Sequence, residues 1–416
     1  MAKAPALGMF QRDSLVDFDR GSRNRGSSHG LVNWLHGLYL AVAGLLLAPI
    51  CSAESDVPMG LKSVGDPVVI RQHTETVHAI ALTPDGTGVI SGGLDSQINA
   101  FLLKNGSPEF MGGQTHWDGI HDLELLPSPQ GLFIVSCSRT RWPNTSGTLR
   151  LATSNGNWQR STGGAVGSNF NAVALSGTGL IAVGGNDRNF GNLRVFDLTR
   201  LDMNAKAAEG SLDPCEIKPT AGAFPSYVAS LTFAPPPKGK ANSMLLGVGC
   251  ATGIIKVVSV SKSGIVESPT TFQGHGIDAV IFGLAFSSDG QVLISAASDS
   301  TIRFWIPQNG TEITQRRITT SALTSFNFEP QSGLLVSGHS DGTVRIFDTQ
   351  GGPTPVLEVK TNRPFPIRGV VIVSLPSTSG KKTSKKPIQR PRIWRIAAGD
   401  EDKAATIWTI ESVVAK

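Results

Sequence analysis

Residues 274–305 read GHGIDAVIFGLAFSSDGQVLISAASDSTIRFW. Within this stretch, apolar residues alternate with polar or small ones in three short runs, at 281–286, 293–297 and 301–305. Alternation with a period of two over such short runs is typical of β-strands, so the stretch predicts three consecutive antiparallel strands. A sheet this small cannot bury both of its faces alone, which suggests that the same unit recurs along the chain.

The pattern does recur, at intervals of roughly 40 to 60 residues. Each copy is marked by the apolar residue that ends its first strand: Leu82, Leu125, Leu175, Phe233, Phe286, Phe328 and Val373. Repeats of about 40 to 45 residues with four strands each are the blades of β-propellers. The composition agrees, because 47 glycines, 25 prolines and only 17% charged residues suit short strands joined by tight turns.

Short motifs that recur in phase resemble the WD-repeat family over residues 67–416. A Gly-His pair stands at 274–275, and a bare histidine stands at His73 and at His116. The family's third-strand signature appears at 192–197, 301–305, 343–348 and 406–408. Its tight-turn aspartate appears as Asp95, Asp299, Asp341 and Asp402. The resemblance implies a propeller that serves as a scaffold without activity of its own.

The resemblance also implies a structural tetrad, in which a loop histidine, a strand serine, a turn aspartate and a tryptophan share hydrogen bonds. The fifth repeat holds all four, as His275, Ser295, Asp299 and Trp305. The first repeat has Phe101 at the tryptophan position, and a phenyl ring cannot donate the indole hydrogen bond.

The two ends of the repeat region predict how the ring closes. Residues 68–71 (VVIR) form a strand before the first complete repeat, and the last repeat ends with its third strand at 406–409 (TIWT). If the N-terminal strand completes the last blade, the ring has no open edge. We therefore expect an all-β fold over residues 67–416, a single seven-bladed β-propeller of four-stranded antiparallel blades.

Residues 1–53 form a leader that differs from the repeats. Residues 1–30 are polar and basic, and residues 31–50 are an apolar run followed by small residues at 51–53. This arrangement fits a signal peptide and also an uncleaved signal-anchor helix that contacts a membrane, so both stay open. In either case the basic residues precede the apolar run, which predicts a propeller outside the cytoplasm, joined by a linker at 54–66.

Three cysteines follow the leader, at Cys137, Cys215 and Cys250. All three can be free thiols packed in the sheets, and a Cys215–Cys250 disulfide is the alternative.

Two neighbouring repeats carry long insertions between their second and third strands, at 138–147 and 186–191. Such insertions lie on the same face of a propeller, and loops on a rigid frame commonly bind partners. The insertions supply a candidate partner-binding patch of Arg139, Arg141, Trp142, Arg188 and Phe190. Tryptophan and arginine often anchor protein interfaces. The alternative is that the aromatic rings fold back on their own blades and the arginines only contact solvent.

A basic segment interrupts the last repeat within residues 374–392. Its cations are Lys381, Lys382, Lys385, Lys386, Arg390 and Arg392. Such a cluster could bind an anionic surface or could simply be a solvated loop. Nucleic acid is not an expected partner, because no aromatic residue interleaves with these lysines.

No nucleophile elbow, phosphate-binding loop or His-Glu-x-x-His motif occurs in the sequence. We therefore predict no catalytic, cofactor-binding or metal site, and a monomer that binds a protein or peptide partner outside the cytoplasm. The alternative is an extracytoplasmic propeller enzyme or sugar-binding protein that acts at the central channel, where Asp122 and Asp278 are the acidic candidates.

Overall fold

The computed structural model describes residues 60–128, 131–142, 145–153, 159–187, 190–201, 210–218, 224–236, 243–318, 321–376 and 391–413, with the backbone alone at 266–270. The described residues belong to one compact unit. They form strands and two short 3-10 helices, η1 (Leu198–Arg200) and η2 (Asp213–Cys215). The expected signal or anchor segment at 31–50 lies outside them, and among them no helix has the length and apolar character needed to cross a bilayer.

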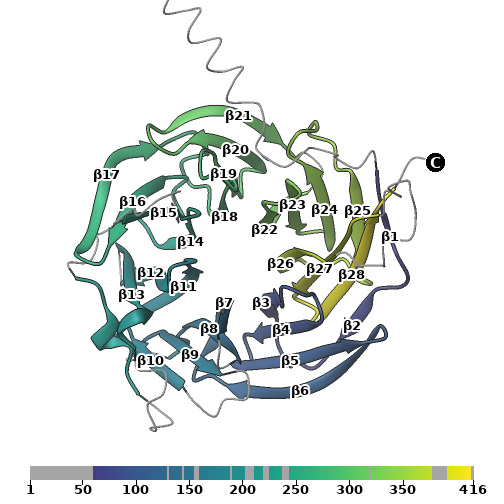
Figure 1. The fold of residues 1–416 in the computed structure, drawn as a ribbon, viewed down its shortest axis with the longest axis horizontal. Coiled ribbons are helices and arrows are strands. Elements are labelled where there is room, and N and C mark those ends of the chain that lie inside the picture. Colours follow the sequence, from purple (N-terminus) through teal and green to yellow (C-terminus); the bar gives the residue numbers. More distant parts are fainter. Residues whose placement is uncertain are drawn as a thin grey trace, which may run out of the picture. The chain divides into compact units, whose positions relative to one another are not determined.

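Seven antiparallel sheets stand around a common axis, and the first three strands of each follow one another in chain order from the axis outward (Figure 1). The innermost strands are β3 (Val77–Leu82), β7 (Gly119–Ser128), β11 (Ser168–Leu175), β14 (Val228–Phe233), β18 (Ile281–Phe286), β22 (Leu323–Glu329) and β26 (Ile367–Ser374). The second strands are β4 (Gly88–Gly93), β8 (Gly131–Arg139), β12 (Leu180–Asp187), β15 (Ser243–Cys250), β19 (Leu293–Ala297), β23 (Leu334–His339) and β27 (Ile393–Asp400). The seven-bladed propeller is thus confirmed, and every predicted repeat marker lies at or near the end of an innermost strand.

The third strands are β5 (Gln97–Lys104), β9 (Thr148–Thr153), β13 (Phe190–Asp197), β16 (Ile255–Ser261), β20 (Thr301–Ile306), β24 (Thr343–Asp348) and β28 (Ala405–Ser412). Five blades have an outer strand that follows in sequence: β6 (Ser107–Thr115), β10 (Gln159–Gly163), β17 (Gly264–Phe272), β21 (Thr311–Arg317) and β25 (Leu357–Lys360). We number the blades one to seven from β3.

The outer position of blade seven is filled from the other end of the chain, as predicted. Two short strands, β1 (Leu61–Ser63) and β2 (Val68–Ile70), both pair antiparallel with β28. Leu61 faces Ser412, and Ile70 faces Ala405. The segment expected as a linker at 54–66 therefore contains β1, and the propeller begins six residues earlier than its predicted start at 67.

Blade three departs from the four-stranded prediction, because its sheet contains only β11, β12 and β13 among the described residues. The described residues 210–218 and 224–226 lie along the outer side instead, through isolated bridges from Phe196 to Glu216 and from Gly191 to Phe224. Arg194 of β13 holds this segment with Nε 2.6 Å from Glu216 Oε1. Proline stands at 214 and 225 among these described residues, and proline cannot donate a ladder hydrogen bond, which explains why they form isolated bridges and no regular strand.

The hydrophobic core lies between neighbouring blades rather than within one. Ile294 and Phe304 of blade five, for example, pack with Leu335 and Phe347 of blade six. A Cβ on Gly283 would lie 2.5 Å from the Phe326 ring of the next inner strand, so a residue without a side chain lets these strands converge on the axis.

The three described cysteines, Cys137, Cys215 and Cys250, are buried free thiols. The alternative of a Cys215–Cys250 disulfide is therefore wrong.

Candidate functional site

One face of the propeller carries the loop histidines, the aspartate turns and the insertion that follows β8. Because the strands of each blade are antiparallel, the loop that enters an innermost strand and the turn between second and third strands reach the same face. We call it the tetrad face and define it by those loops, which include the described residues 116–118, 140–142, 145–147 and 274–280.

Blade five shows how this face is built where the sequence motif is complete. His275 Nδ1 lies 3.0 Å from Asp299 Oδ2 and donates its proton there, so Nε2 accepts from the Ser295 hydroxyl at 2.7 Å. Trp305 Nε1 donates to the same Ser295 oxygen at 2.8 Å. Burial opposes ionisation of Asp299, but the hydrogen bonds from His275 and Thr301 outweigh it and hold the pKa of this carboxyl well below its usual range. The four side chains thus link loop, strand and turn.

Blade one keeps this arrangement without the tryptophan. His73 Nδ1 lies 3.0 Å from Asp95 Oδ1, and Nε2 lies 2.9 Å from Ser91 Oγ. Phe101 occupies the tryptophan position, and Asn99 Nδ2 approaches His73 Nε2 at 3.3 Å instead.

Blade two has the loop histidine but not its partners. His116 is 4% exposed, and neither ring nitrogen has a hydrogen-bond partner among the described residues. The insertion at 140–147 stands where other blades have the short turn with an aspartate. The third strands of blades two and five can be aligned on Arg150 and Arg303, and two residues later blade two has Ala152 where blade five has Trp305. Blade two therefore has a buried imidazole without the aspartate that holds His275 in blade five.

A cavity of about 340 Å³ opens on the tetrad face at this blade. Its lining consists of Trp117, Asp118, Trp142, Thr145, Ser146, Thr148, Ser161 and Gly163. The two indoles come from different loops, since Trp117 precedes β7 and Trp142 lies in the insertion after β8. Trp117 is 83% exposed and Trp142 is 68% exposed, so both rings present most of their apolar surface to solvent.

The insertion that carries Trp142 is fixed to the blades on both sides. Arg141 Nη1 donates to Glu75 Oε1 of blade one at 3.1 Å. Thr140 N donates to Asn169 Oδ1 of blade three at 2.8 Å. Within the loop, the Thr145 hydroxyl donates to the Trp142 carbonyl at 2.9 Å. Trp142 therefore projects from a loop whose backbone is held by several hydrogen bonds.

The structure places the members of the predicted patch differently. Arg139, Trp142 and Phe190 are exposed, which argues against the alternative that the aromatic rings fold back on their blades. Arg141 is exposed too, but its guanidinium forms an ion pair with Glu75, so its role includes joining two blades. Phe190 is absent from the lining of the cavity that contains Trp142, and Arg188 lies outside the described residues.

Sequence reasoning missed Trp117, although a signal was present. The residue after the loop histidine is Thr74 in blade one and Gly276 in blade five, whereas blade two has a tryptophan there. An indole in a polar loop next to a turn has no place in a strand core, which makes a surface role the natural expectation.

Exposed aromatic rings gather on the tetrad face. They are Trp117, Trp142, Phe190, Tyr227 and Phe365, each from a loop or strand end on that side. Among the described residues, the one exposed aromatic ring elsewhere is Phe110 of the outer strand β6. Clusters of exposed aromatic surface are typical of places where a partner docks.

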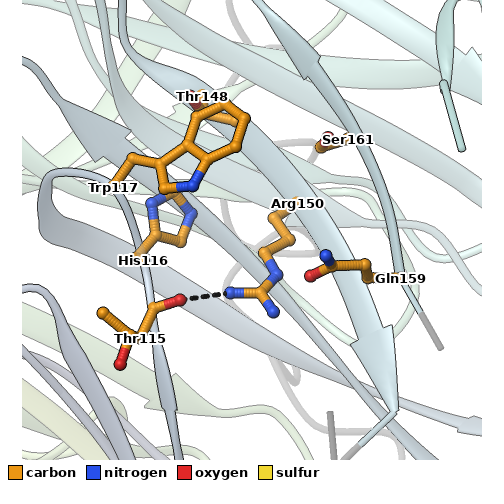
Figure 2. Close-up of a pocket in the computed structure, with 7 residues that line it drawn as sticks. All are labelled: Thr115, His116, Trp117, Thr148, Arg150, Gln159 and Ser161. Carbon is orange, nitrogen blue, oxygen red and sulfur yellow. Dashed lines mark hydrogen bonds between the residues drawn. The ribbon is translucent and has the colours of Figure 1, made fainter. Parts of the chain in front are cut away.

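A smaller cavity of about 80 Å³ adjoins the larger one (Figure 2). It is lined by Thr115, His116, Trp117, Thr148, Arg150, Gln159 and Ser161. Figure 2 shows the guanidinium of Arg150 pointing toward Thr115, whose carbonyl accepts from Nη1 at 2.7 Å, with His116 and Gln159 on either side. The two cavities share Trp117, Thr148 and Ser161.

Burial, together with the charge of Arg150, lowers the pKa of His116 to about 3. The imidazole is therefore neutral in the folded protein, whereas in the unfolded chain it gains a proton below about pH 6.5. The folded pKa is depressed, so the stability linked to this group is fully present above about pH 6.5 and falls as the pH decreases toward 3. We expect His116→Gln to reduce the loss of unfolding free energy between pH 7 and pH 5 by about 1 to 2 kcal/mol.

Urea unfolding of both proteins at these two pH values measures that difference. His78 and His121 also have lowered pKa values because of burial, and His121 reaches about 2, so the variant should retain part of the acid sensitivity. An unchanged pH dependence in the variant would show that His116 is protonated in the folded protein.

The other sequence-based candidates do not form a site among the described residues. Lys381, Lys382, Lys385, Lys386 and Arg390 lie outside those residues, and Arg392 is exposed with its backbone N–H bonded to Ser412 Oγ. Of the two acidic candidates near the axis, Asp278 is exposed in a loop. Asp122 accepts backbone hydrogen bonds from Leu123 and, across the blade boundary, from Val173, each at 2.9 Å, which gives it a structural use.

The ring and the tetrad define the chain as a seven-bladed β-propeller with WD40 repeats. Residues 66–101, 267–305 and 313–348 match the family described as WD domain, G-beta repeat. Each segment begins at the outer strand of one blade and continues through the three inner strands of the next, which are those of blades one, five and six.

The chain is similar to several eukaryotic proteins. It is 30% identical over 102 residues to eukaryotic translation initiation factor 3 subunit I of Schizosaccharomyces pombe, with 23% of this chain and 30% of that protein covered. It is 32% identical over 83 residues to COMPASS component SWD3 of Saccharomyces cerevisiae, with 20% and 26% covered. For serine-threonine kinase receptor-associated protein of Dictyostelium discoideum, the identity is 28% over 89 residues, with 21% and 29% covered. The chain thus matches less than a third of the length of each, and WD-repeat proteins like these are protein-interaction scaffolds.

These relatives correct the expected location. They are intracellular eukaryotic proteins, and this finding overturns the prediction of an exported or membrane-anchored propeller. The prediction rested on the apolar run at 31–50 and its basic flank. A pattern of charge and hydropathy of that kind is weak when the run contains polar residues, as this one does at Asn33 and His36.

Proposed function

We propose that this protein is a non-catalytic scaffold that binds a protein or peptide partner on the tetrad face, with Trp117 and Trp142 as the main contacts. The observation that supports it most is the cavity between these two exposed indoles. Tryptophan supplies a large apolar area with little loss of conformational freedom, which makes it frequent among residues that dominate binding energy. The similarity to interaction scaffolds agrees with this role.

The hydrogen bonds of the loop that carries Trp142 favour a binding surface whose conformation changes little when a partner binds. The loop of Trp142 is tied to blades one and three by Arg141 and Thr140. Ordering a mobile loop would reduce affinity, so a loop that is already fixed favours binding. Phe190 and Arg139 extend the exposed surface of the predicted patch and would contact a longer partner.

Replacing both indoles tests the proposal. Peptides selected from a random display library on the full-length protein serve as probes, and their affinity is measured by fluorescence anisotropy. We expect the double variant Trp117→Ala/Trp142→Ala to weaken binding about 10-fold or more, because the side chains at the centre of an interface carry most of its energy. Its melting temperature should stay close to that of the wild type, because both indoles are exposed.

Phe110→Ala is the matched control, since it removes an exposed aromatic ring from the outer strand β6 instead. It should leave peptide affinity within about twofold. Peptides that bind both variants as well as the wild type would place the docking surface elsewhere. A loss of binding that accompanies unfolding would likewise contradict the role of the indoles.

A further inference from the structure

The larger cavity on the tetrad face combines one carboxylate with two indoles. Among its described lining residues, Asp118 is the one that carries a charge, and it stands beside Trp117 and Trp142. The remaining lining consists of hydroxyl side chains and a glycine. Trp117 and Asp118 lie in the loop before β7, whereas Trp142 lies in the insertion after β8. Two loops that are separate in sequence therefore bring these three side chains to one cavity.

Asp118 is a buried acid whose charge is not paired. It is 7% exposed and forms no ion pair within the described part of the chain, because the guanidinium of Arg141 pairs with Glu75 instead. Burial raises the pKa of Asp118, and the backbone N–H and the charge of Arg141 offset only part of this effect. A carboxylate in this setting would be stabilised by a cation that enters the cavity.

The two indoles favour the same kind of ligand. The face of an indole carries negative potential and attracts a cation that lies within about 6 Å of the ring centre. Trp117 and Trp142 are both largely exposed, so a ligand in the cavity can reach them. A purely apolar ligand would leave Asp118 without a partner, and an acidic ligand would be repelled by it. A cation suits all three side chains.

We infer that the larger cavity binds the arginine side chain of a protein or peptide partner. This inference rests on the proposed function, because the same two indoles carry both. Asp118 would accept two N–H groups of the guanidinium, and the indoles would stack against its plane. The hydroxyls of Ser146 and Ser161, which also line the cavity, can accept from the remaining N–H groups.

Shape and hydration favour arginine over lysine. A guanidinium is planar, so it can lie against an indole while two of its N–H groups bond one carboxylate. It is also more weakly hydrated than the ammonium of lysine, which lowers the cost of leaving water for a cavity with two aromatic walls. The volume of about 340 Å³ lies near the lower end of the range of about 300 to 1,000 Å³ that is typical of ligand sites, which suits a single long side chain.

Two arginines of this chain stand next to the cavity without lining it. Arg141 pairs with Glu75 of blade one, and Arg150 donates to the Thr115 carbonyl from the smaller cavity. Neither belongs to the lining that Asp118 shares with the indoles. The cation that Asp118 lacks is therefore expected from a partner.

A double-mutant cycle with the full-length protein tests the inference. Peptides selected from a random display library are the probes, and fluorescence anisotropy measures their affinity. Each arginine of a selected peptide is changed to citrulline, which keeps the shape of the side chain and removes its charge. We expect one position at which citrulline weakens binding about 10-fold, and we expect Asp118→Asn to weaken the parent peptide similarly. The combination should lose little more than either change alone, because both remove the same ion pair.

Matched substitutions separate this pairing from other effects. Asp118→Asn keeps a side-chain oxygen that can accept from the Arg141 backbone N–H, so the loop should stay folded. Asp278→Asn removes the same charge from an exposed position on the tetrad face, in the loop before β18, and should change affinity by less than about twofold. Lysine in place of the critical peptide arginine should recover only part of the affinity lost with citrulline, because an ammonium keeps the charge but not the planar fork.

The indole resonances give a readout that does not depend on affinity. In a protein with ¹⁵N-labelled tryptophan, the parent peptide should shift the Nε1 signals of Trp117 and Trp142. The signal of Trp305, which is buried and bonded to Ser295, should not move. The citrulline peptide, added to the same degree of saturation, should produce smaller shifts at both exposed indoles.

The outcomes distinguish this inference from the proposed function. Peptides that need Trp117 and Trp142 but tolerate both citrulline and Asp118→Asn would overturn the arginine site and leave the docking face intact. Peptides that ignore the indoles would overturn both. A lysine or trimethyl-lysine peptide that binds more tightly than its arginine counterpart would overturn the assignment of arginine. If Asp118→Asn fails to fold, the citrulline and lysine peptides on the wild-type protein decide the question.

Discussion

A chain that begins at residue 71 is expected to lose cooperative folding, whereas a chain that begins at residue 60 is expected to unfold like the full-length protein. The first truncation removes β1 and β2, which together form the outer layer of blade seven on β28. It leaves the backbone groups on that side of β28 unpaired and opens the one place where the ring is closed by the other end of the chain.

The size of the effect follows from burial. Leu61 and Ile70 are buried, at 8% and 6% exposure, and Ile70 packs with Ala397, Ala405 and Ile407 of blade seven. Loss of two such side chains removes about 3 to 6 kcal/mol of hydrophobic stabilisation, which is comparable with the entire stability of many domains. Loss of the strand hydrogen bonds adds to this deficit.

Calorimetry and size-exclusion chromatography of the two truncated proteins measure the effect. Residues 60–416 should give a single sharp transition and elute as one species, while residues 71–416 should show a broad transition and aggregation through the exposed edge of β28. Equal melting temperatures for the two would mean that blade seven is stable without its outer strands and that closure contributes little.

The number of blades was predictable from the repeat pattern because every blade must bury its sheet against its two neighbours. Residues such as Phe286 and Phe328 end inner strands that must be buried between neighbours, and this demand recurs in phase around the ring. The closing strand at 68–70 was predictable for a similar reason, since an open edge in the last blade would otherwise remain.

The candidate site was harder to predict because it depends on contacts between residues far apart in sequence. Arg141 is 66 residues from Glu75, and only the packing of blade two against blade one brings them together. The cavity requires both Trp117 and Trp142, and the sequence offers no register that places one loop against the other. Pattern reasoning found the insertion and its tryptophan, but not the second indole or the cavities.

In blade three, too, contacts between distant residues determined a part of the fold that the sequence pattern could not predict. Its third strand carries the regular motif at 192–197, so a fourth strand was expected to follow. What replaces that strand is fixed by particular contacts, such as Arg194 with Glu216 and Asp213, and by prolines that prevent a ladder. Strand periodicity carries no information about such contacts.

Trp305→Ala is expected to lower the unfolding free energy by about 3 to 5 kcal/mol, the usual loss when a large buried aromatic side chain is truncated. Trp305 is 1% exposed and lies in the core between blades, with its ring edge-on to Phe272. Trp305→Phe should lose much less, about 1 kcal/mol, because it keeps most of the buried ring and removes the hydrogen bond to Ser295, whose oxygen still bonds His275.

Urea denaturation of the two variants measures this difference, with Trp142→Ala as the control for loss of an exposed tryptophan, expected to change stability by less than about 0.5 kcal/mol. Equal losses for Trp305→Phe and Trp305→Ala would mean that the indole hydrogen bond, and not ring burial, carries the contribution of this residue.

The expected difference in stability between Trp305→Phe and Trp305→Ala bears on how blade two could become a binding site. Blade one already folds with Phe101 at the tryptophan position and keeps His73 bonded to Asp95 and Ser91. If the hydrogen bonds of a tetrad contribute only about 1 kcal/mol each, a seven-bladed ring tolerates their loss in one blade. Blade two has lost them and has instead an exposed indole beside a buried histidine and a cavity. A small effect of Trp305→Phe would therefore support the view that a structural position in blade two was free to become a position that contacts a partner.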